Sequence, residues 1–313
     1  MAYTSGGTIQ ALDYNLLTWG GNSTGTYTST PSNLAYVWGV GNGQFGYGQD
    51  VSLISAVTGG STVNATQWSG LVYTLNKALA HQSGTAAQLA TGSNIGIVAG
   101  ATIAAFANVA TAVTTVNTNK LNFNSTRGAT TTGANFDTAF NTSSFTQTIT
   151  VTFASADQAR YFFNLGGRLS LVFSPSGLTD NNKENSYNEL MNAVGTLHLD
   201  QLTSTRTGTG ETTTTDGLAI GYWDLTTSNQ TILKLTSDNA TYTGNTLEIF
   251  MRVAGAAGTN GGLGTQVIYD ITYTDGADEA FNDAVSGTFR HRVDVVVPET
   301  TFVANSWGVF GIT

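Results

Sequence analysis

The stretch that most constrains the fold is residues 145–173, FTQTITVTFASADQARYFFNLGGRLSLVF. Phe145, Ile149, Val151 and Phe153 occupy alternate positions, with threonine at 146, 148, 150 and 152 between them. Successive side chains of a strand point to opposite faces. The pattern therefore predicts a strand with one buried apolar face and one face of threonine hydroxyls.

A short helix and a sharp turn are predicted directly after this strand. Ser155 and Gln158 have the spacing of a capping box, and the glycine pair before Leu169 tolerates positive φ. A second strand then resumes the alternation, so the whole stretch is interpreted as a packing hub. The residues expected to determine its fold are Phe162, Phe163, Asn164, Gly166 and Gly167.

The N-terminal part of the chain predicts helices separated by a polar linker. The clearest helix covers residues 65–80, where Asn64 and Gln67 resemble a cap pair and Trp68 begins an apolar stripe. A second helix is expected over residues 100–121. The apolar face of this second helix is expected to consist of Ile103, Phe106, Ala110, Val113 and Leu121. Within residues 1–20, helical spacing is also found for Ile9, Leu12, Leu16, Leu17 and Trp19.

A glycine-rich loop, GNGQFGYGQ, occupies residues 41–49 and ends in Tyr47, Gly48 and Gln49. It lacks the Lys-Ser/Thr pair of a phosphate-binding loop and the flanking strand and helix that such a loop needs. We therefore expect it to pack against its own helix or a neighbour. No cofactor is predicted.

From residue 145 onward the pattern is mostly β. Period-2 alternation predicts strands at 246–253, 266–273 and 288–297, with further strands expected at 196–202, 217–225 and 231–236. A helix capped by Ser186 and Glu189 is expected before Gly195. The predicted fold class is α+β, an N-terminal helical anchoring region followed by a mainly antiparallel β-sandwich domain. The expected division is an arm with linker and loop at 1–60, a helical region at 61–125 and the sandwich at 126–313.

Charge and composition narrow the function classes. The chain has 11 basic and 20 acidic residues, a net charge of −9, and only 10% charged residues, so a nucleic-acid partner is not expected. It has no cysteine, which excludes disulfides and thiolate metal sites. No run of apolar residues is long enough to span a membrane. Residues 1–10 lack the charged region and the apolar region of a signal peptide, so none is predicted there.

Three groups of residues are candidates for metal binding, proton transfer or ligand contact. The acidic segment 270–283 does not match an EF-hand loop, and a solvated loop is favoured over a bound calcium ion. The three histidines lack metal-ligand spacing. His81 is expected to act as a cation at a helix end, and His291 as an inward-facing structural residue. The five tryptophans are interpreted as core or subunit contacts, with Trp307 as an interface anchor. No catalytic or metal residue is predicted, and the protein is not expected to be an enzyme.

The order of several short motifs resembles a known group of proteins. These motifs are TI and YN within residues 8–15, GYGQ at 46–49, QW at 67–68, HQ at 81–82 and ADQARYFFNLGG at 156–167. Together they resemble tailed-bacteriophage virion structural proteins, which recur in myophages, including cyanophages. The resemblance implies a particle component that is assembled in the host cytoplasm, and it transfers no catalytic residue.

The leading hypothesis is a virion subunit of the neck, tail or baseplate/fibre that packs on copies of itself and on neighbouring virion proteins. The alternative is a receptor- or carbohydrate-binding module of the same particle, with a host surface glycan as partner. A depolymerase-type enzyme is the third reading, and it needs two converging carboxylates.

Overall fold

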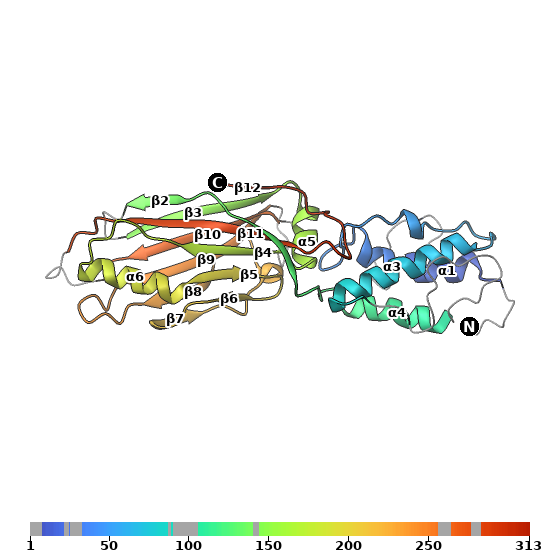
Figure 1. Ribbon diagram of the computed structural model, residues 1–313, viewed down its shortest axis with the longest axis horizontal. Coiled ribbons are helices and arrows are strands. Elements are labelled where there is room, and N and C mark those ends of the chain that lie inside the picture. Colours follow the sequence, from blue (N-terminus) through green and yellow to red (C-terminus); the bar gives the residue numbers. More distant parts are fainter. Residues whose placement is uncertain are drawn as a thin grey trace. The chain divides into compact units, whose positions relative to one another are not determined.

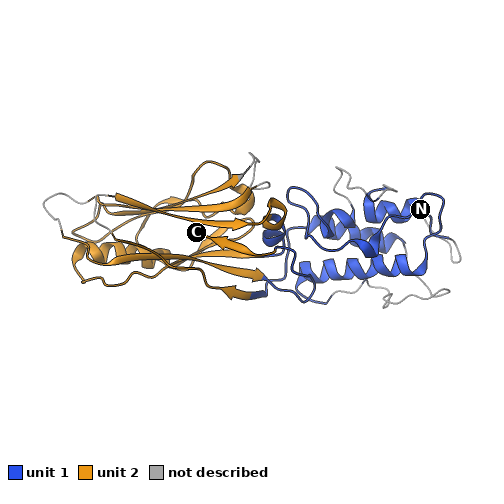
Figure 2. Ribbon diagram, turned by 90° about the horizontal axis from the view of Figure 1, so that it is seen from above, with its two compact units in different colours: residues 1–128, 160–166, 298–307 blue, residues 129–159, 167–297, 308–313 orange. Residues whose placement is uncertain are grey.

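The computed structural model describes residues 8–21, 25, 33–86, 89, 106–139, 144–255, 264–276 and 283–313. The chain divides into two compact units (Figure 2). Unit 1 comprises Met1–Gly128, Arg160–Gly166 and Pro298–Trp307. Unit 2 comprises Ala129–Ala159, Gly167–Val297 and Gly308–Thr313. In the described part of the chain, the N-terminal helices precede two antiparallel sheets, with two further α-helices between strands, which confirms the α+β class.

The described helices of unit 1's N-terminal segment are α1 Ala11–Trp19, α2 Leu34–Trp38, the 3-10 helix η1 Ser52–Ile54, α3 Ala65–Ser83 and α4 Phe106–Thr118 (Figure 1). The predicted capping box of α3 is confirmed, since the Asn64 side chain accepts from the Gln67 N–H and the Gln67 side chain accepts from the Asn64 N–H, both at 2.9 Å. The helix continues to Ser83, with Gly84 as its C-cap, so His81 lies in its last turn, as predicted. Among the described residues, none of the helices has the length and apolar character that crossing a membrane requires.

Two predicted helix faces differ from the observed ones. In α1 the described side chains are buried except at two positions, Leu12 and Leu16, which are 63% and 54% exposed. In α4 the buried face is formed by Val109, Ala112, Val113 and Val116. Of the set predicted from spacing, Val113 lies on this face, Phe106 and Ala110 do not, and Ile103 lies outside the described residues. Short apolar and threonine-rich helices allow more than one apolar stripe, and tertiary packing selects between them. The threonines of α4 instead bond to carbonyls one turn back, as Thr111 does to Ala107 at 2.9 Å.

Unit 2 is built from two antiparallel sheets. In sheet 1 the strand order is β1-β11-β4-β5-β6, with β2 also paired to β11; in sheet 2 it is β12-β3-β10-β9-β8-β7. The strands of sheet 1 are β1 Arg127–Thr131, β2 Phe136–Ala139, β4 Arg168–Phe173, β5 Thr196–Leu199, β6 Ser204–Arg206 and β11 Thr288–Pro298. Those of sheet 2 are β3 Ser144–Phe153, β7 Thr212–Asp216, β8 Gln230–Thr236, β9 Thr246–Gly255, β10 Gly264–Thr274 and β12 Phe310–Ile312.

The apolar faces of the two sheets meet in one core. Tyr273 of β10 packs on Phe289 of β11 with ring centroids 4.8 Å apart, and its hydroxyl lies 2.8 Å from His291 Nε2 of β11. Tyr187 of α6 (Asn182–Val194) contacts both rings at 5.8 and 5.5 Å. The predicted β-sandwich arrangement is therefore observed, with α6 packed against its aromatic core.

Some boundaries predicted from sequence are wrong. Residues 217–225 form a turn and the 3-10 helix η2 Tyr222–Asp224 instead of a strand. A Cβ atom at Gly221 would lie 2.2 Å from the Leu202 carbonyl carbon. Glycine is therefore required here because two backbone segments pack closely, and not because the residue belongs to a β-strand. The helix with the predicted cap at Ser186 begins five residues earlier, because Asn181 and not Ser186 accepts the capping hydrogen bond, from Glu184 N.

Candidate functional site

The two most specific sequence motifs meet in unit 1. The second half of helix α5 (Ala156–Asn164) belongs to this unit, as does the loop at residues 41–49. Asn164 Nδ2 donates to the carbonyl oxygens of Gln44 and Gly46 at 3.3 and 3.1 Å. Arg160 Nη2 donates to Val40 O at 3.1 Å. The helix end thus satisfies the carbonyls of a loop that lies more than a hundred residues earlier in the chain. We call this assembly, with its neighbours described below, the motif core.

Gly48 and Gly166 are required by close packing in the motif core. Gly48 has φ +65°, and a Cβ there would lie 2.4 Å from Cδ2 of the Tyr161 ring. Gly166 has φ +91°, and a Cβ there would lie 2.2 Å from Cδ2 of Phe123. The positive φ of the glycine pair therefore falls at Gly166 and not at Gly167.

Tyr47 is the centre of the motif core. Its side chain is fully buried, its hydroxyl donates to Lys120 O at 2.9 Å and accepts from Gln82 Nε2 at 2.8 Å. Burial raises the pKa of this hydroxyl above its ordinary value. Its ring meets the His81 ring edge to face at 5.3 Å. A tyrosine held this way has a structural role, and its hydroxyl stays protonated at neutral pH.

Gln49 joins the loop to residues 298–307 of the same unit. Its Nε2 donates to Ala304 O at 3.0 Å and its Oε1 accepts from Ala304 N at 2.7 Å. Ser306 Oγ donates to Tyr47 O at 2.7 Å. Chain segments near residues 45, 164 and 304 are thereby held by one hydrogen-bonded network. Sequence spacing carried no signal for the contribution of Ala304 and Ser306.

The remaining predicted motif residues are also packing residues. Phe162 and Phe163 are fully buried, with their rings edge to face at 5.0 Å. Trp68 is 1% exposed on α3. All five tryptophans are buried, so the expectation that Trp307 anchors an interface is wrong: it is 2% exposed within unit 1.

The histidines differ in part from expectation. His81 is 1% exposed, and burial lowers its pKa to about 4, so it is neutral at pH 7 and not the expected cation. Burial likewise lowers the pKa of His291 to about 4. His291 is buried and hydrogen-bonded to Tyr273, as predicted for a structural histidine.

A serine–histidine pair was not anticipated from sequence. Ser170 Oγ of β4 lies 2.9 Å from His198 Nδ1 of β5, and Asp294 of β11 is the cross-strand neighbour of Ser170. The Asp294 carboxylate, however, accepts from Arg292 and from Gly133 N, at 3.0 and 3.1 Å. It therefore does not orient the imidazole as the acid of a hydrolytic triad does, and Ser170 is only 3% exposed.

The acidic segment 270–283 is dispersed by the fold. Asp270 lies within β10 and pairs with Arg252 of β9, whereas Asp275 Oδ2 lies 2.5 Å from Lys183 Nζ of α6. Asp278 and Glu279 lie outside the described residues. The carboxylates of Asp270 and Asp275 thus neutralise cations in different places and do not converge on one ion.

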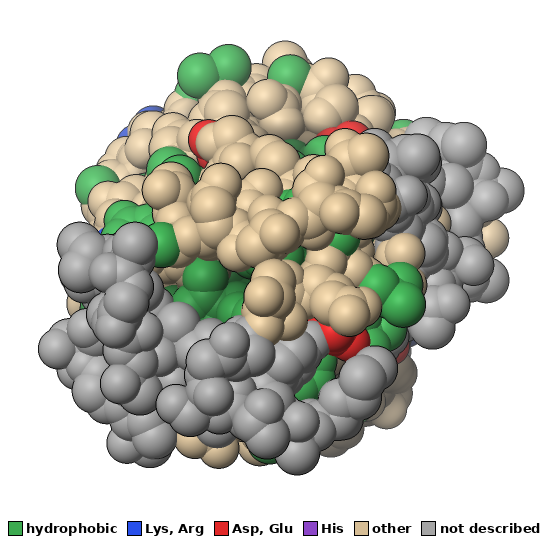
Figure 3. Space-filling view, turned by 90° about the vertical axis from the view of Figure 1, so that its right-hand side faces the viewer, with side chains coloured by type: hydrophobic (Ala, Val, Ile, Leu, Met, Phe, Trp, Pro, Cys, Tyr) green, Lys and Arg blue, Asp and Glu red, His purple; other side chains and the backbone are tan. Residues whose placement is uncertain are grey.

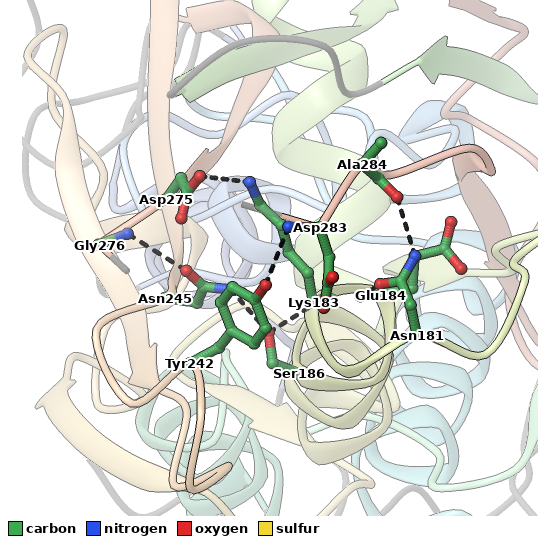
Figure 4. A network of polar contacts seen from close by, with 10 residues as sticks. All are labelled: Asn181, Lys183, Glu184, Ser186, Tyr242, Asn245, Asp275, Gly276, Asp283 and Ala284. Atoms are coloured by element: carbon green, nitrogen blue, oxygen red, sulfur yellow. Dashed lines mark hydrogen bonds and ion pairs between the residues drawn. The ribbon is translucent and has the colours of Figure 1, made fainter. Parts of the chain in front are cut away.

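Lys183 and Asp275 belong to a polar network at one end of the sandwich (Figure 4). Asn245 Nδ2 donates to Ser186 Oγ at 2.7 Å, Gly276 N donates to Asn245 Oδ1 at 3.2 Å, and Asp283 N donates to Tyr242 Oη at 3.1 Å. These bonds tie the first turns of α6 to the loops that follow β8 and β10. Their role is to satisfy buried polar groups where the sheets end.

A different group of carboxylates is the nearest approach to a metal centre among the described residues. Ligand atoms of Glu189, Glu211 and Asp238 lie within 4.8 Å of one another. Glu189 and Asp238 are exposed, and burial raises the pKa of Glu211. The three carboxylates have the chemistry for a hard cation, but three surface acids are common without one.

Comparison of the chain with protein-family models, with curated proteins and with solved structures finds no match.

Proposed function

We propose that the protein is a structural subunit of a tailed-phage particle, at the neck, tail or baseplate/fibre, and that unit 1 mediates its self-association. The order of the motifs supports the particle assignment. The motif residues bond to one another inside unit 1 and are buried there. The outer surface of the unit is therefore left for packing against other subunits.

The observation that carries the self-association proposal is the distribution of exposed apolar side chains. Seven large hydrophobic residues in the described part of the chain are exposed, and five of them belong to unit 1. These five are Leu12, Leu16, Val40, Leu53 and Tyr73. Figure 3 shows apolar atoms reaching the surface between polar ones on the face that it views.

Leu12 and Leu16 form the sharpest feature of this surface. They are one turn apart on α1, so their side chains share one face of the helix. All other residues of this helix are buried, so the helix is anchored on its remaining sides while two leucines face outward. Apolar side chains presented on a fixed helix are typical of subunit interfaces.

The test is the double substitution Leu12→Ser with Leu16→Ser in the full chain. We expect a lower mass by analytical ultracentrifugation and a loss of incorporation into particles in a complementation assay, with the far-UV circular dichroism unchanged. The matched control is Leu202→Ser, since Leu202 is 43% exposed but belongs to unit 2. An unchanged mass and normal incorporation of the double variant would contradict the proposal.

A further inference from the structure

The outer face of sheet 2 is mostly polar, and it also carries the phenyl ring of Phe250 and the buried side chain of Ile268. On β3 the core side chains are Ile149, Val151 and Phe153, so the intervening threonines point outward. The register continues this outward face across the sheet: Thr148 pairs with Asp270 of β10, and Asp270 pairs with Phe250 of β9. Phe250 pairs in turn with Thr231 of β8. Neighbouring strands lie about 4.8 Å apart, so these four strands form a surface about 14 Å wide.

The polar groups beside Phe250 are held in place by one another. Asp270 Oδ1 accepts from Thr148 Oγ1 at 2.7 Å, and Asp270 Oδ2 accepts from Asn229 Nδ2 at 3.2 Å. Arg252 Nη1 donates to Asp270 Oδ2 and to Asn229 Oδ1. This cluster presents donors and acceptors in fixed positions next to a half-buried aromatic ring.

Each charge of this face has a counter-charge within the face. Lys234 Nζ lies 3.0 Å from Glu248 Oε2, and Arg252 pairs with Asp270. The face therefore matches a neutral partner better than an acidic or a basic one. Threonine hydroxyls surround these pairs, as in the contact of Thr146 Oγ1 with Thr272 Oγ1 at 2.8 Å.

We propose that the outer face of sheet 2 binds a neutral glycan chain centred on Phe250. A phenyl ring stacks on the apolar face of a sugar ring, and carboxylate, amide and guanidinium groups bond to sugar hydroxyls. Asn229 is exposed and Arg252 half-buried on this face, so they supply an amide and a guanidinium group to a bound sugar, while the buried Asp270 carboxylate holds both in position. A broad face suits several consecutive sugar rings, whereas a single sugar is normally enclosed in a pocket. This binding activity is independent of the self-association proposed for unit 1.

The experiment uses the full-length protein and linear glucan, mannan and galactan hexasaccharides, with binding followed by isothermal titration calorimetry. We expect at least one of these neutral oligosaccharides to bind. Phe250→Ala and Asn229→Ala are each expected to weaken that binding about tenfold or more, because each removes a central contact. Phe250→Tyr keeps the ring and should retain binding.

The matched control is Thr205→Ala, since Thr205 is an exposed threonine on β6 of sheet 1, and its affinity should be unchanged. The proposal is overturned if none of the three hexasaccharides binds, or if binding is unaffected by Phe250→Ala. It is also overturned if Phe250→Ala instead converts a dimer into a monomer in ultracentrifugation, since the face would then be covered by a second copy.

Discussion

At the scale of single residues, Gly166 has the least freedom to change. Its positive φ costs an L-residue of order 1–3 kcal/mol, and the added Cβ would overlap the Phe123 ring. We expect Gly166→Ala to lower the free energy of unfolding by about 2 kcal/mol or more, measured by urea denaturation.

Gly59→Ala is the control for this substitution, because no atom lies within 4 Å of the Cβ position at Gly59. If Gly166→Ala were as stable as Gly59→Ala, the close packing of Gly166 on Phe123 would not hold in solution.

The two buried histidines predict how stability depends on pH. Their folded pKa values of about 4 lie below the ordinary value of 6.5, so the unfolded chain takes up protons first as the pH falls. The stabilisation that comes from keeping these histidines neutral in the folded state is therefore fully present above pH 6.5. It is lost as the pH falls from 6.5 to 4. A shift of this size corresponds to about 3 kcal/mol for each histidine.

Urea midpoints at pH 7, 5.5 and 4.5 would measure this loss, and His81→Leu should remove part of it. Glu184 does not obscure the result, because hydrogen bonds from Ser286 and Thr179 outweigh its desolvation and lower its pKa to about 2, which places its own effect below pH 4.5. Constant stability from pH 7 to 4.5 would show that the histidines are not buried as neutral groups.

At the scale of elements, the Asn164 side-chain amide makes two of the polar contacts between α5 and the 41–49 loop. Asn164→Asp preserves the shape but replaces the donating amide with a carboxylate, which would face the carbonyl oxygens of Gln44 and Gly46. Leaving buried acceptors unsatisfied costs about 1–3 kcal/mol each. We expect a clear drop in melting temperature by calorimetry.

Asn64→Asp is the comparison for that variant, because the Asn64 side chain caps α3 by accepting a hydrogen bond from Gln67 N, which a carboxylate also does. Equal melting temperatures for the two variants would mean that the amide of Asn164 does not support the loop.

At the scale of the whole molecule, unit 1 is not a continuous piece of sequence. It takes Arg160–Gly166 and Pro298–Trp307 from the C-terminal half, and Arg160, Asn164 and Ala304 satisfy polar groups of its loop. Residues 1–128 alone are therefore expected to lack a cooperative thermal transition and to be cleaved rapidly by trypsin. A cooperative transition at the temperature of the full chain would show that the two later segments are dispensable.

The sequence by itself determined those helices, strands and turns that form through interactions between residues close together in the chain. The alternation of residues 145–153, the cap at Asn64 and the glycine turn after Asn164 each arise from interactions within a few positions, so their patterns are visible in the chain. The α+β class follows from the same patterns. The motif residues of the candidate site were also found in this way, although not their contacts.

Tertiary structure alone decided where those elements meet and which faces they bury. Asn164 contacts carbonyls 118 and 120 positions away, Gln49 contacts a segment 255 positions away, and no period in the sequence encodes such pairs. The same packing turned Leu12 and Leu16 outward while Trp307 was buried, because a side chain's exposure is set by the neighbours that the fold brings to it and not by its own hydrophobicity.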